Sequence, residues 1–562
     1  MFQAFFSSRC GHYAILIVVT AALMLPNLGA NSLWDIDEAL NSEASREMLE
    51  RGTWIVPTFN FELRSAKPAM LNWMQMLSYQ VFGVNEFGAR IPSVLMGLLT
   101  VLLTYELARR MFTPITGLLS GIILTSAAEF CLLSHAATPD APMLFFLVLS
   151  FTIFWFRSMN GSRKWWLPMS VACGLGVLTK GPVCVAMPAI VLILYFACNR
   201  DLSRLWDRKI ITAFLVFLAV ILPWYILVSV ETRGAWIKDF LFRHNFGRFV
   251  SPMENHGGPI LYHAIGLLFL YAPWCIFLFA TIWHGVRQAR VRPTTPHPEV
   301  DLTIEQTPNG VRAYRFLIVW FTTYLVFFSI AATKLPNYVL PLYPALAILT
   351  GRLLERWRLR VIESPRWLTA VSFTCLLLVG VVTFAGLKLA SGAWKLPFGK
   401  MPSLEGVDAW ASIGLVPVVT AMFAWWFYRR DERSGVLVSL SVGAAVYIGL
   451  LAGGGSLAFD EHKAPRALVA EAGAFQPDKE IRLGSLVYFQ PSTVFYAQRQ
   501  IERLESTKQA SDFLSLPIPV YVFVEEKIWN GVKQQIVPTC EPIAKHWDLY
   551  KNGNVLVVWN GK

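Results

Sequence analysis

The sequence has few charged residues and lacks the motifs of nucleotide-driven machines. Only 15% of its 562 residues are Asp, Glu, Lys or Arg, whereas soluble globular proteins contain about 25%. It has no Walker motif, no GxGxxG after a strand and no HExxH. ATP-driven transport therefore has no support in the sequence.

Cysteine is also scarce and carries no pairing pattern. Eight cysteines are present and none forms a CxxC pair. A disulfide framework or a zinc ribbon is therefore not expected. The eight are Cys10, Cys131, Cys173, Cys184, Cys198, Cys275, Cys375 and Cys540. Most lie in or beside apolar runs, where they are expected to act as small buried side chains.

Long apolar runs dominate the chain, which is 55% hydrophobic and contains 21 Trp. Runs of about 20 residues are long enough to span a bilayer, and Trp is enriched at membrane interfaces. The sequence predicts a polytopic α-helical membrane protein with roughly 13 spans, near 13–30, 91–108, 115–134, 141–157, 166–179, 181–198, 210–230, 260–283, 315–333, 338–351, 367–388, 409–428 and 434–454.

The basic residues indicate how the chain is oriented. Arg and Lys gather in alternate loops, for example at 200–209, 352–360 and 429–433, and such loops are typically cytoplasmic. The N-terminus is then cytoplasmic. On the opposite side, which is the periplasm in a bacterium, we expect 31–90, 135–140, 231–259, 389–408 and the tail after 455.

Two domains are predicted. Residues 1–455 form a transmembrane domain, and its first periplasmic loop, 31–90, carries surface helices at 36–49 and 69–83. Residues 456–562 form a small periplasmic α/β domain. Its expected strands are the apolar runs IRLGSLVYF (481–489), PVYVFV (519–524) and VLVVW (555–559).

Acidic residues lie where membrane spans end. Asp35, Asp37 and Glu38 follow the first apolar run, and Asp140 stands alone in ATPDAPM. Acids this close to hydrocarbon are costly unless they have partners or a function. Two alternatives stay open: Asp37 as a residue of a solvated loop, and Asp140 as a helix N-cap.

Cations lie on the same predicted side as these acids. Cations and acids together at the bilayer surface suit transfer from a phosphate-linked lipid, because cations hold the leaving group and a carboxylate activates or orients the acceptor. The alternative is that the cations meet lipid head groups. The candidates are Lys67, Lys180, Arg243, His244, Arg248 and Lys334.

A divalent metal site is a further hypothesis. His256 and His263 lie in MENHGGPILYHAIG, close to Glu254. Imidazole and carboxylate groups are suitable ligands, but the spacing is not diagnostic. No cofactor is certain from the sequence, and a site at His256 and Glu254 stays open.

Several segments of the chain resemble those of a known family. WDIDEALNSEASREMLERGTWIVPTFN, AKPAMLNWMQMLSYQVFG, EFGARIPSVL, TPDAPM, TKGP, HNFGRF, ENHGGP and KLPNYVLPLYP occur in that order. They resemble the bacterial branch of the dolichyl-phosphate-mannose protein mannosyltransferase superfamily, glycosyltransferase family 39, and within it the enzymes that transfer aminoarabinose to lipid A. The resemblance implies a C-type glycosyltransferase fold and a polyprenyl-phosphate sugar donor.

The resemblance also implies roles for individual residues. Asp37 matches the family's catalytic Asp, with Glu38 beside it, and Asp140 matches its second loop acid. Lys67 and Arg248 match residues implied to contact the donor phosphate, and Lys334 matches the lysine of the KLP motif.

The chain departs from the family pattern at two places. Leu40 and Asn41 stand where relatives usually have Arg and Tyr. Ala66 replaces a glutamate that is associated with metal in the aminoarabinose enzyme.

The sequence therefore predicts an inverting glycosyltransferase of the bacterial inner membrane. The donor is a sugar on undecaprenyl phosphate, and the acceptor is lipid A, another glycan or a protein at the periplasmic face. The alternative function is a transporter or flippase of lipid-linked sugars, which typically has an inverted repeat and charges near the bilayer midplane. No such repeat is evident, and no nucleic-acid partner is expected.

Overall fold

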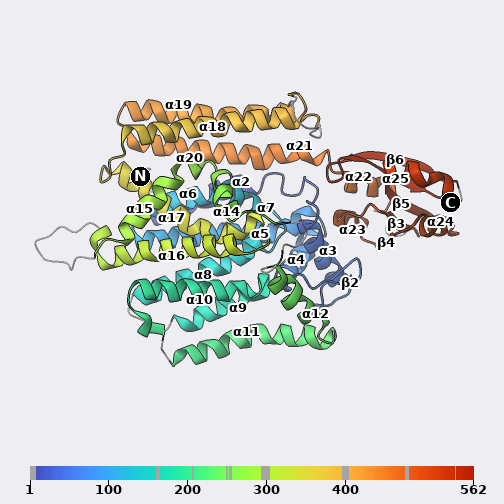
Figure 1. The fold of residues 1–562 in the computed structure, drawn as a ribbon, viewed down its shortest axis with the longest axis horizontal. Helices are drawn as coiled ribbons and strands as arrows, with labels where there is room; N and C mark the ends of the chain where they lie inside the picture. Colours follow the sequence, from blue (N-terminus) through green and yellow to red (C-terminus); the bar gives the residue numbers. More distant parts are fainter. Residues whose placement is uncertain are drawn as a thin grey trace, which may run out of the picture.

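The computed structural model describes residues 8–159, 165–205, 208–248, 251, 256–292, 304–394, 404–474, 480–537 and 539–562. Most helices run roughly side by side, and the C-terminal strands lie beyond one end of them (Figure 1). The polytopic helical architecture with a small C-terminal sheet confirms the predicted fold class.

Seven helical segments among the described residues are long and apolar enough to cross a membrane. They are α5 (Glu86–Met111), α8 (Asp140–Met159), α11 (Lys209–Glu231), α16 (Pro308–Ile330), α18 (Arg366–Ala390), the pair η6 (Val407–Gly414) and α19 (Leu415–Arg429), and the run α20 (Arg433–Leu450), η7 (Leu451–Gly455) and α21 (Ser456–Asp460). Helices suit this environment because they satisfy their own backbone polar groups.

Two bent pairs raise this number to nine if each forms one span. The pair α6 (Pro114–Thr125) and α7 (Ala128–His135) bends by 65°. The helix α14 (Tyr262–Leu270) meets η3 (Trp274–Phe277) and α15 (Leu278–Ala289) at 119°. The remaining predicted segments form shorter helices, so the count of roughly 13 spans stays a prediction: α2 (Arg9–Met24), α9 (Trp166–Lys180), α10 (Val183–Cys198) and α17 (Tyr343–Arg358).

Both predicted surface helices of the first loop are present. They are α3 (Asp37–Glu50) and α4 (Met70–Phe82), separated by the short strands β1 (Thr58–Phe59) and β2 (Glu62–Leu63). Their interface is polar: Ser45 Oγ donates to Gln75 Oε1 at 2.6 Å, and Asn72 Nδ2 donates to Ser45 Oγ at 2.9 Å. Such buried networks fix one arrangement of the two helices.

Short helical segments complete the end of the bundle that the sequence predicts to be periplasmic. The segments α12 (Ala235–Lys238) and η2 (Asp239–Gly247) follow α11, and η5 (Pro336–Leu342) precedes α17. Two others, η1 (Leu202–Leu205) and η4 (Ile304–Gln306), lie in the predicted cytoplasmic loops.

The C-terminal region forms a five-stranded sheet in the order β4-β3-β5-β7-β6. The strands are β3 (Arg482–Leu486), β4 (Ile501–Leu504), β5 (Val520–Glu525), β6 (Glu541–Asp548) and β7 (Gly553–Trp559). The first three strands in this order pair in parallel, and β7 pairs antiparallel with β5 and β6. The accompanying helices are α22 (Ala464–Glu471), α23 (Pro491–Ala497), α24 (Thr507–Leu514), α25 (Glu526–Val532) and η8 (Lys533–Gln535).

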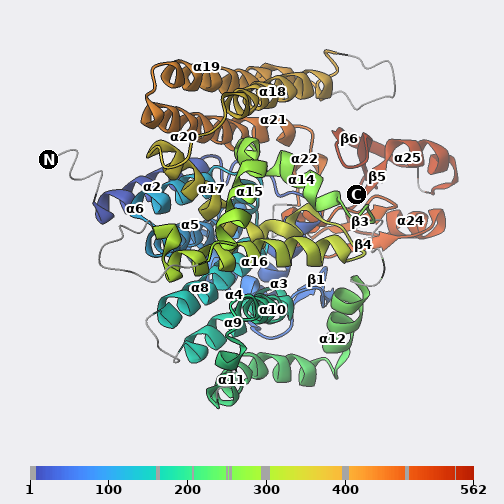
Figure 2. The same ribbon diagram turned by 60° about the vertical axis from the view of Figure 1, so that its left-hand side comes forward.

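The C-terminal region is hydrogen-bonded to the first loop, and Figure 2 shows β3 and β4 together at one side of the molecule. Ser492 donates to Asp35 through its backbone N–H and its hydroxyl, both at 2.7 Å. Asn60 exchanges two hydrogen bonds with the backbone of Ile501, at 3.0 and 2.9 Å. The tail thus holds the segment that leads directly into α3.

Candidate active site

A cavity with about 1190 Å³ of empty space, part of it open to the surroundings, lies between the first loop and the helices α8, α9, α10 and α16. Polar side chains line one part of it, and apolar side chains such as Leu147, Met187 and Phe328 line another. A polar end joined to an apolar wall suits a lipid that carries a charged head group. The polar lining residues include Lys67, Lys180, His244, Arg248, Asn337 and Tyr338.

Asp140 is held at the N-terminus of α8 by two neighbours. Its carboxylate forms an ion pair with Lys180, the last residue of α9. Asn337 Nδ2 donates to both Asp140 oxygens, at 3.2 and 3.3 Å. The break after Lys180 is made by Gly181, which has φ +103° and where a Cβ atom would lie 2.7 Å from Phe240 Cζ. Three chain segments therefore fix the position of this carboxylate.

Asp37 is the first residue of α3, and its side chain is exposed to solvent. The surrounding protein still removes part of the water around its carboxylate, which raises the pKa of Asp37. Nearby Asp140 raises this pKa further, while Lys67, Lys180 and Arg248 lower it. These five charged groups are thus close enough to influence one another. Four of the residues named from the sequence, Asp37, Asp140, Lys67 and Arg248, thus lie in one neighbourhood, and their roles stay predictions.

The backbone before Asp37 is strained. Ile36 has φ +55°, a conformation that is a genuine outlier for a β-branched residue. Asn41 Nδ2 donates to the Asp37 carbonyl at 2.7 Å and holds the turn on its helical side. Strain of this kind persists where surrounding contacts enforce it and is common at functional sites.

Lys67 lies opposite these acids, just before α4. Burial lowers its pKa to about 7, with further lowering by Lys180 and Arg248. The Arg248 guanidinium in turn lies 3.5 Å from the Tyr338 hydroxyl. Cations that face each other in a shielded cavity destabilise one another and favour binding of an anion.

Glu38, which the sequence suggested as catalytic, faces away from this cavity. Its carboxylate accepts hydrogen bonds from Arg90 at 2.8 and 2.9 Å and from the backbone N–H groups of Trp34 and Ala137. Burial alone would raise its pKa, but these contacts outweigh burial and hold the pKa at about 2. Glu38 therefore joins α3 to α5 and to the loop before Asp140, which is a positioning role.

Two other candidate residues of the loop after α11, Arg243 and His244, lie next to Asp239. Arg243 Nη1 lies 3.8 Å from Asp239 Oδ1, and the Arg243 side chain is 68% exposed. His244 Nε2 lies 3.4 Å from Asp239 Oδ2, and burial lowers the pKa of His244. His244 lines the cavity, whereas Arg243 is not among the residues that line it.

The Lys334 side chain binds backbone carbonyl groups. Its ammonium donates to the carbonyls of Ser329 at 2.5 Å, Ala331 at 2.6 Å and Phe328 at 3.3 Å. These carbonyls belong to the last turn of α16 and the residue after it, which otherwise lack intrahelical partners. The contacts give Lys334 a helix-capping role beside the cavity rather than within it.

The described residues do not fit a metal ion. Within them, no group of three or more His, Cys, Asp or Glu side chains is placed to hold one. His256 is exposed, Glu254 lies outside the described residues, and His263 is buried in α14. Ala66 offers no ligand beside Lys67. We derive no catalytic step that uses a metal.

Arg64 is a site residue that the sequence analysis did not identify. Its Nη2 donates to Asn41 Oδ1 at 2.8 Å, while its Nη1 is buried without a hydrogen-bond partner among the described residues. Burial lowers its pKa to about 10, against the opposing effect of Asp37. Its position three residues before Lys67, in the same loop, was the available signal.

Comparisons with known proteins identify the family and the fold. Residues 66–227 match the family model described as dolichyl-phosphate-mannose-protein mannosyltransferase. A Pseudomonas aeruginosa (strain UCBPP-PA14) protein described as undecaprenyl phosphate-alpha-4-amino-4-deoxy-L-arabinose arabinosyl transferase is 30% identical over 428 residues, which cover 74% of this chain and 73% of that protein. An uncharacterized protein of Aquifex aeolicus is 26% identical over 541 residues, 96% of this chain and 93% of that protein.

Among solved structures, ArnT from Cupriavidus metallidurans bound to undecaprenyl phosphate has the same fold. The two structures give a TM-score of 0.76 at 20% identity, and the match covers 98% of each chain. The apo form of the same protein gives 0.76 at 22% identity. The likeness extends from the membrane helices to the C-terminal sheet.

Proposed function

The chain belongs to the dolichyl-phosphate-mannose-protein mannosyltransferase family, glycosyltransferase family 39, and we propose that it transfers a sugar from undecaprenyl phosphate to lipid A or another envelope acceptor. It is a multi-pass membrane glycosyltransferase. We place the reaction at the periplasmic face of the inner membrane, because the cavity lies at the end of the bundle opposite to the arginine-rich loops.

In this proposal the cations of the cavity hold the donor. Lys67 and Arg248 bind the phosphate, since charge-assisted hydrogen bonds to phosphate are the strong ones. The apolar wall at Leu147, Met187 and Phe328 takes the first isoprene units of the donor. The same cations stabilise the charge that develops on the phosphate as it leaves.

Asp37 acts on the acceptor. The acceptor oxygen attacks the anomeric carbon as the bond from that carbon to the phosphate oxygen breaks, which inverts the configuration. If the acceptor is a hydroxyl group, its proton passes to Asp37. If the acceptor is a phosphate, it is already ionised and Asp37 orients it. Asp140, which is held by Lys180 and Asn337, adds a second negative charge near Asp37.

The observation that carries this proposal is that Lys67, Lys180 and Arg248 line one cavity and lie close enough to Asp37 to shift its pKa, as Asp140 does. These charges lie at the ends of spans. A transporter of lipid-linked sugars would instead require charges near the middle of the spans. Family membership also favours the transferase over the flippase.

The proposal is tested by Asp37→Asn in the purified full-length protein with a polyprenyl-phosphate sugar donor. We expect kcat to fall by about 10²–10⁴, while binding of undecaprenyl phosphate is retained. The matched control is Asp512→Asn, an exposed acid of α24. Unchanged transfer by Asp37→Asn would refute the assigned role. Mass spectrometry of lipid A from cells with and without the gene identifies the acceptor.

A further inference from the structure

A second large cavity lies at the other end of the bundle and shares no lining residue with the catalytic cavity. It has about 1220 Å³ of empty space between α15, α17, α18 and α20. Its inner wall is apolar and buried, with Phe373 from α18 and Val436, Leu437 and Leu440 from α20. Nothing in the proposed reaction uses this space.

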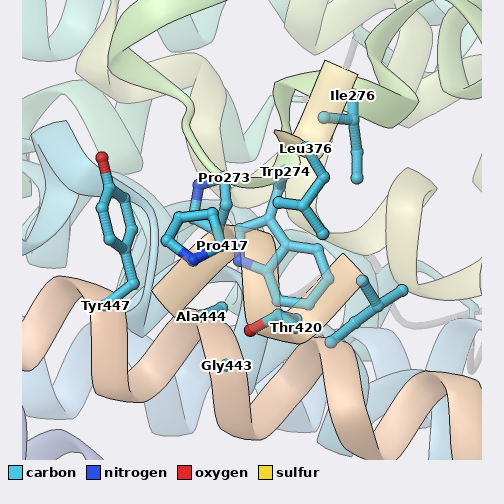
Figure 3. A pocket seen from close by; sticks show the side chains of 10 residues that line it. Pro273, Trp274, Ile276, Leu376, Pro417, Thr420, Gly443, Ala444 and Tyr447 are labelled. Carbon is cyan, nitrogen blue, oxygen red and sulfur yellow. The ribbon is translucent and has the colours of Figure 1, made fainter. Parts of the chain in front are cut away.

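A narrow apolar crevice lies next to it, lined by Trp274 of η3, Pro417 of α19 and Ala444 of α20 (Figure 3). Leu440 lines both cavities, and the smaller one extends along α20 past Ala444 to Tyr447. Residues 436–447 span about 16 Å of helix axis at 1.5 Å per residue. A row of α20 side chains thus faces both spaces, with Leu440 shared between them.

The mouth of the larger cavity carries two opposite charges. Arg287 of α15 and Glu363 of the loop before α18 both line it and are exposed. In the part of the chain that the structure describes, neither residue has an ion-pair partner. The hydroxyls of Ser364 and Thr369, 2.9 Å apart, add polar groups at the same mouth.

The mouth lies at the arginine-rich end of the protein. It is close to the start of α20 at Arg433, whose Nη1 donates to the carbonyl of Trp357, a lining residue. The helix α20 runs from there towards the C-terminal domain, at the opposite end in Figure 1. By the distribution of basic residues this end faces the cytoplasm, so the mouth opens to the cytoplasmic leaflet.

We propose that this cavity binds a zwitterionic aminophospholipid of the cytoplasmic leaflet, with its phosphate on Arg287, its ammonium on Glu363 and one acyl chain along α20. A guanidinium and a carboxylate at one mouth complement a phosphate and an ammonium on one head group. An apolar gap between helices that is open to a bilayer gains dispersion contacts when a chain fills it. The site is separate from sugar transfer.

The test is native mass spectrometry of the full-length protein in detergent, with phosphatidylethanolamine, phosphatidylcholine or phosphatidylglycerol added. We expect phosphatidylethanolamine to bind about tenfold more tightly than the other two. Choline cannot donate a hydrogen bond to Glu363, and glycerol offers it no charge. Equal retention of the three lipids would overturn the proposal.

Variants separate the two head-group contacts. Glu363→Gln is expected to abolish the preference for phosphatidylethanolamine over phosphatidylglycerol and to leave phosphatidylglycerol binding in place. Arg287→Gln is expected to weaken binding of all three lipids about tenfold. The control is Arg290→Gln, an exposed cation of the same region that does not line the cavity. Wild-type binding by Arg287→Gln, or an equal loss in Arg290→Gln, would overturn the proposal.

Discussion

Donor binding is expected to weaken as pH rises through neutrality, because Lys67 loses its proton there. Its pKa in the empty site is about 7, lowered by burial and by Lys180 and Arg248. A bound phosphate favours the ammonium form, so binding takes up a proton above pH 7. Affinity is then constant well below pH 7 and falls about tenfold per unit above it, to roughly a hundredfold weaker at pH 9.

The measurement is calorimetric titration with a polyprenyl phosphodiester, whose single charge does not change over this range. At pH 8 we expect uptake of roughly 0.9 proton per ligand, read from the dependence of the binding enthalpy on the buffer. Lys67→Arg is expected to flatten the profile, because guanidinium stays charged. Lys238→Arg, at an exposed lysine, is the matched control. Constant wild-type affinity from pH 6 to 9, or the same decline in Lys67→Arg, would refute the reasoning.

Three other substitutions test the surroundings of the site. Glu38→Gln leaves Arg90 buried without a counter-charge and is expected to lower the free energy of unfolding by about 3–5 kcal/mol; an unchanged thermal midpoint would contradict the positioning role. Arg64→Gln is expected to raise KM about tenfold with a smaller effect on the midpoint, because one guanidinium nitrogen has no protein partner; steady-state kinetics with unchanged KM would remove Arg64 from the site. Ser492→Ala, which removes one donor to Asp35, is expected to lower the unfolding free energy by about 1–2 kcal/mol, and denaturation without that change would show that this contact does not hold the first loop.

The central strands of the C-terminal sheet were predictable from the sequence, but its edges were not. The runs at 481–489, 519–524 and 555–559 correspond to β3, β5 and β7, which are flanked by other strands. A strand covered on both sides reads as a continuous apolar run. The edge strand β4 exposes its two middle side chains, and β6 exposes half of its eight, so their sequences resemble polar loops.

The types of charged residue at the site were predictable from the sequence, but the separate role of each residue was not. Asp37 and Glu38 are adjacent, and both are acids at the end of a span. The start of α3 between Ile36 and Asp37 leaves the Asp37 carboxylate exposed near Lys67 and turns that of Glu38 to Arg90, 52 residues away along the chain. Lys334 likewise differs from Lys180 only in its surroundings: one ammonium meets carbonyls, the other a carboxylate.

The departure from the family at Asn41 has a physical counterpart in the site. Its side chain donates to the carbonyls of Asp37 at 2.7 Å and Ala137 at 3.2 Å and accepts from Arg64 at 2.8 Å. One amide thus links the strained turn before α3, the loop that leads to Asp140 and a buried guanidinium. An arginine–tyrosine pair in the positions of Leu40 and Asn41 would have to make these links with larger groups. The substrate specificity of this chain is therefore expected to differ around Asn41 and Arg64, while the donor phosphate contact at Lys67 is expected to be retained.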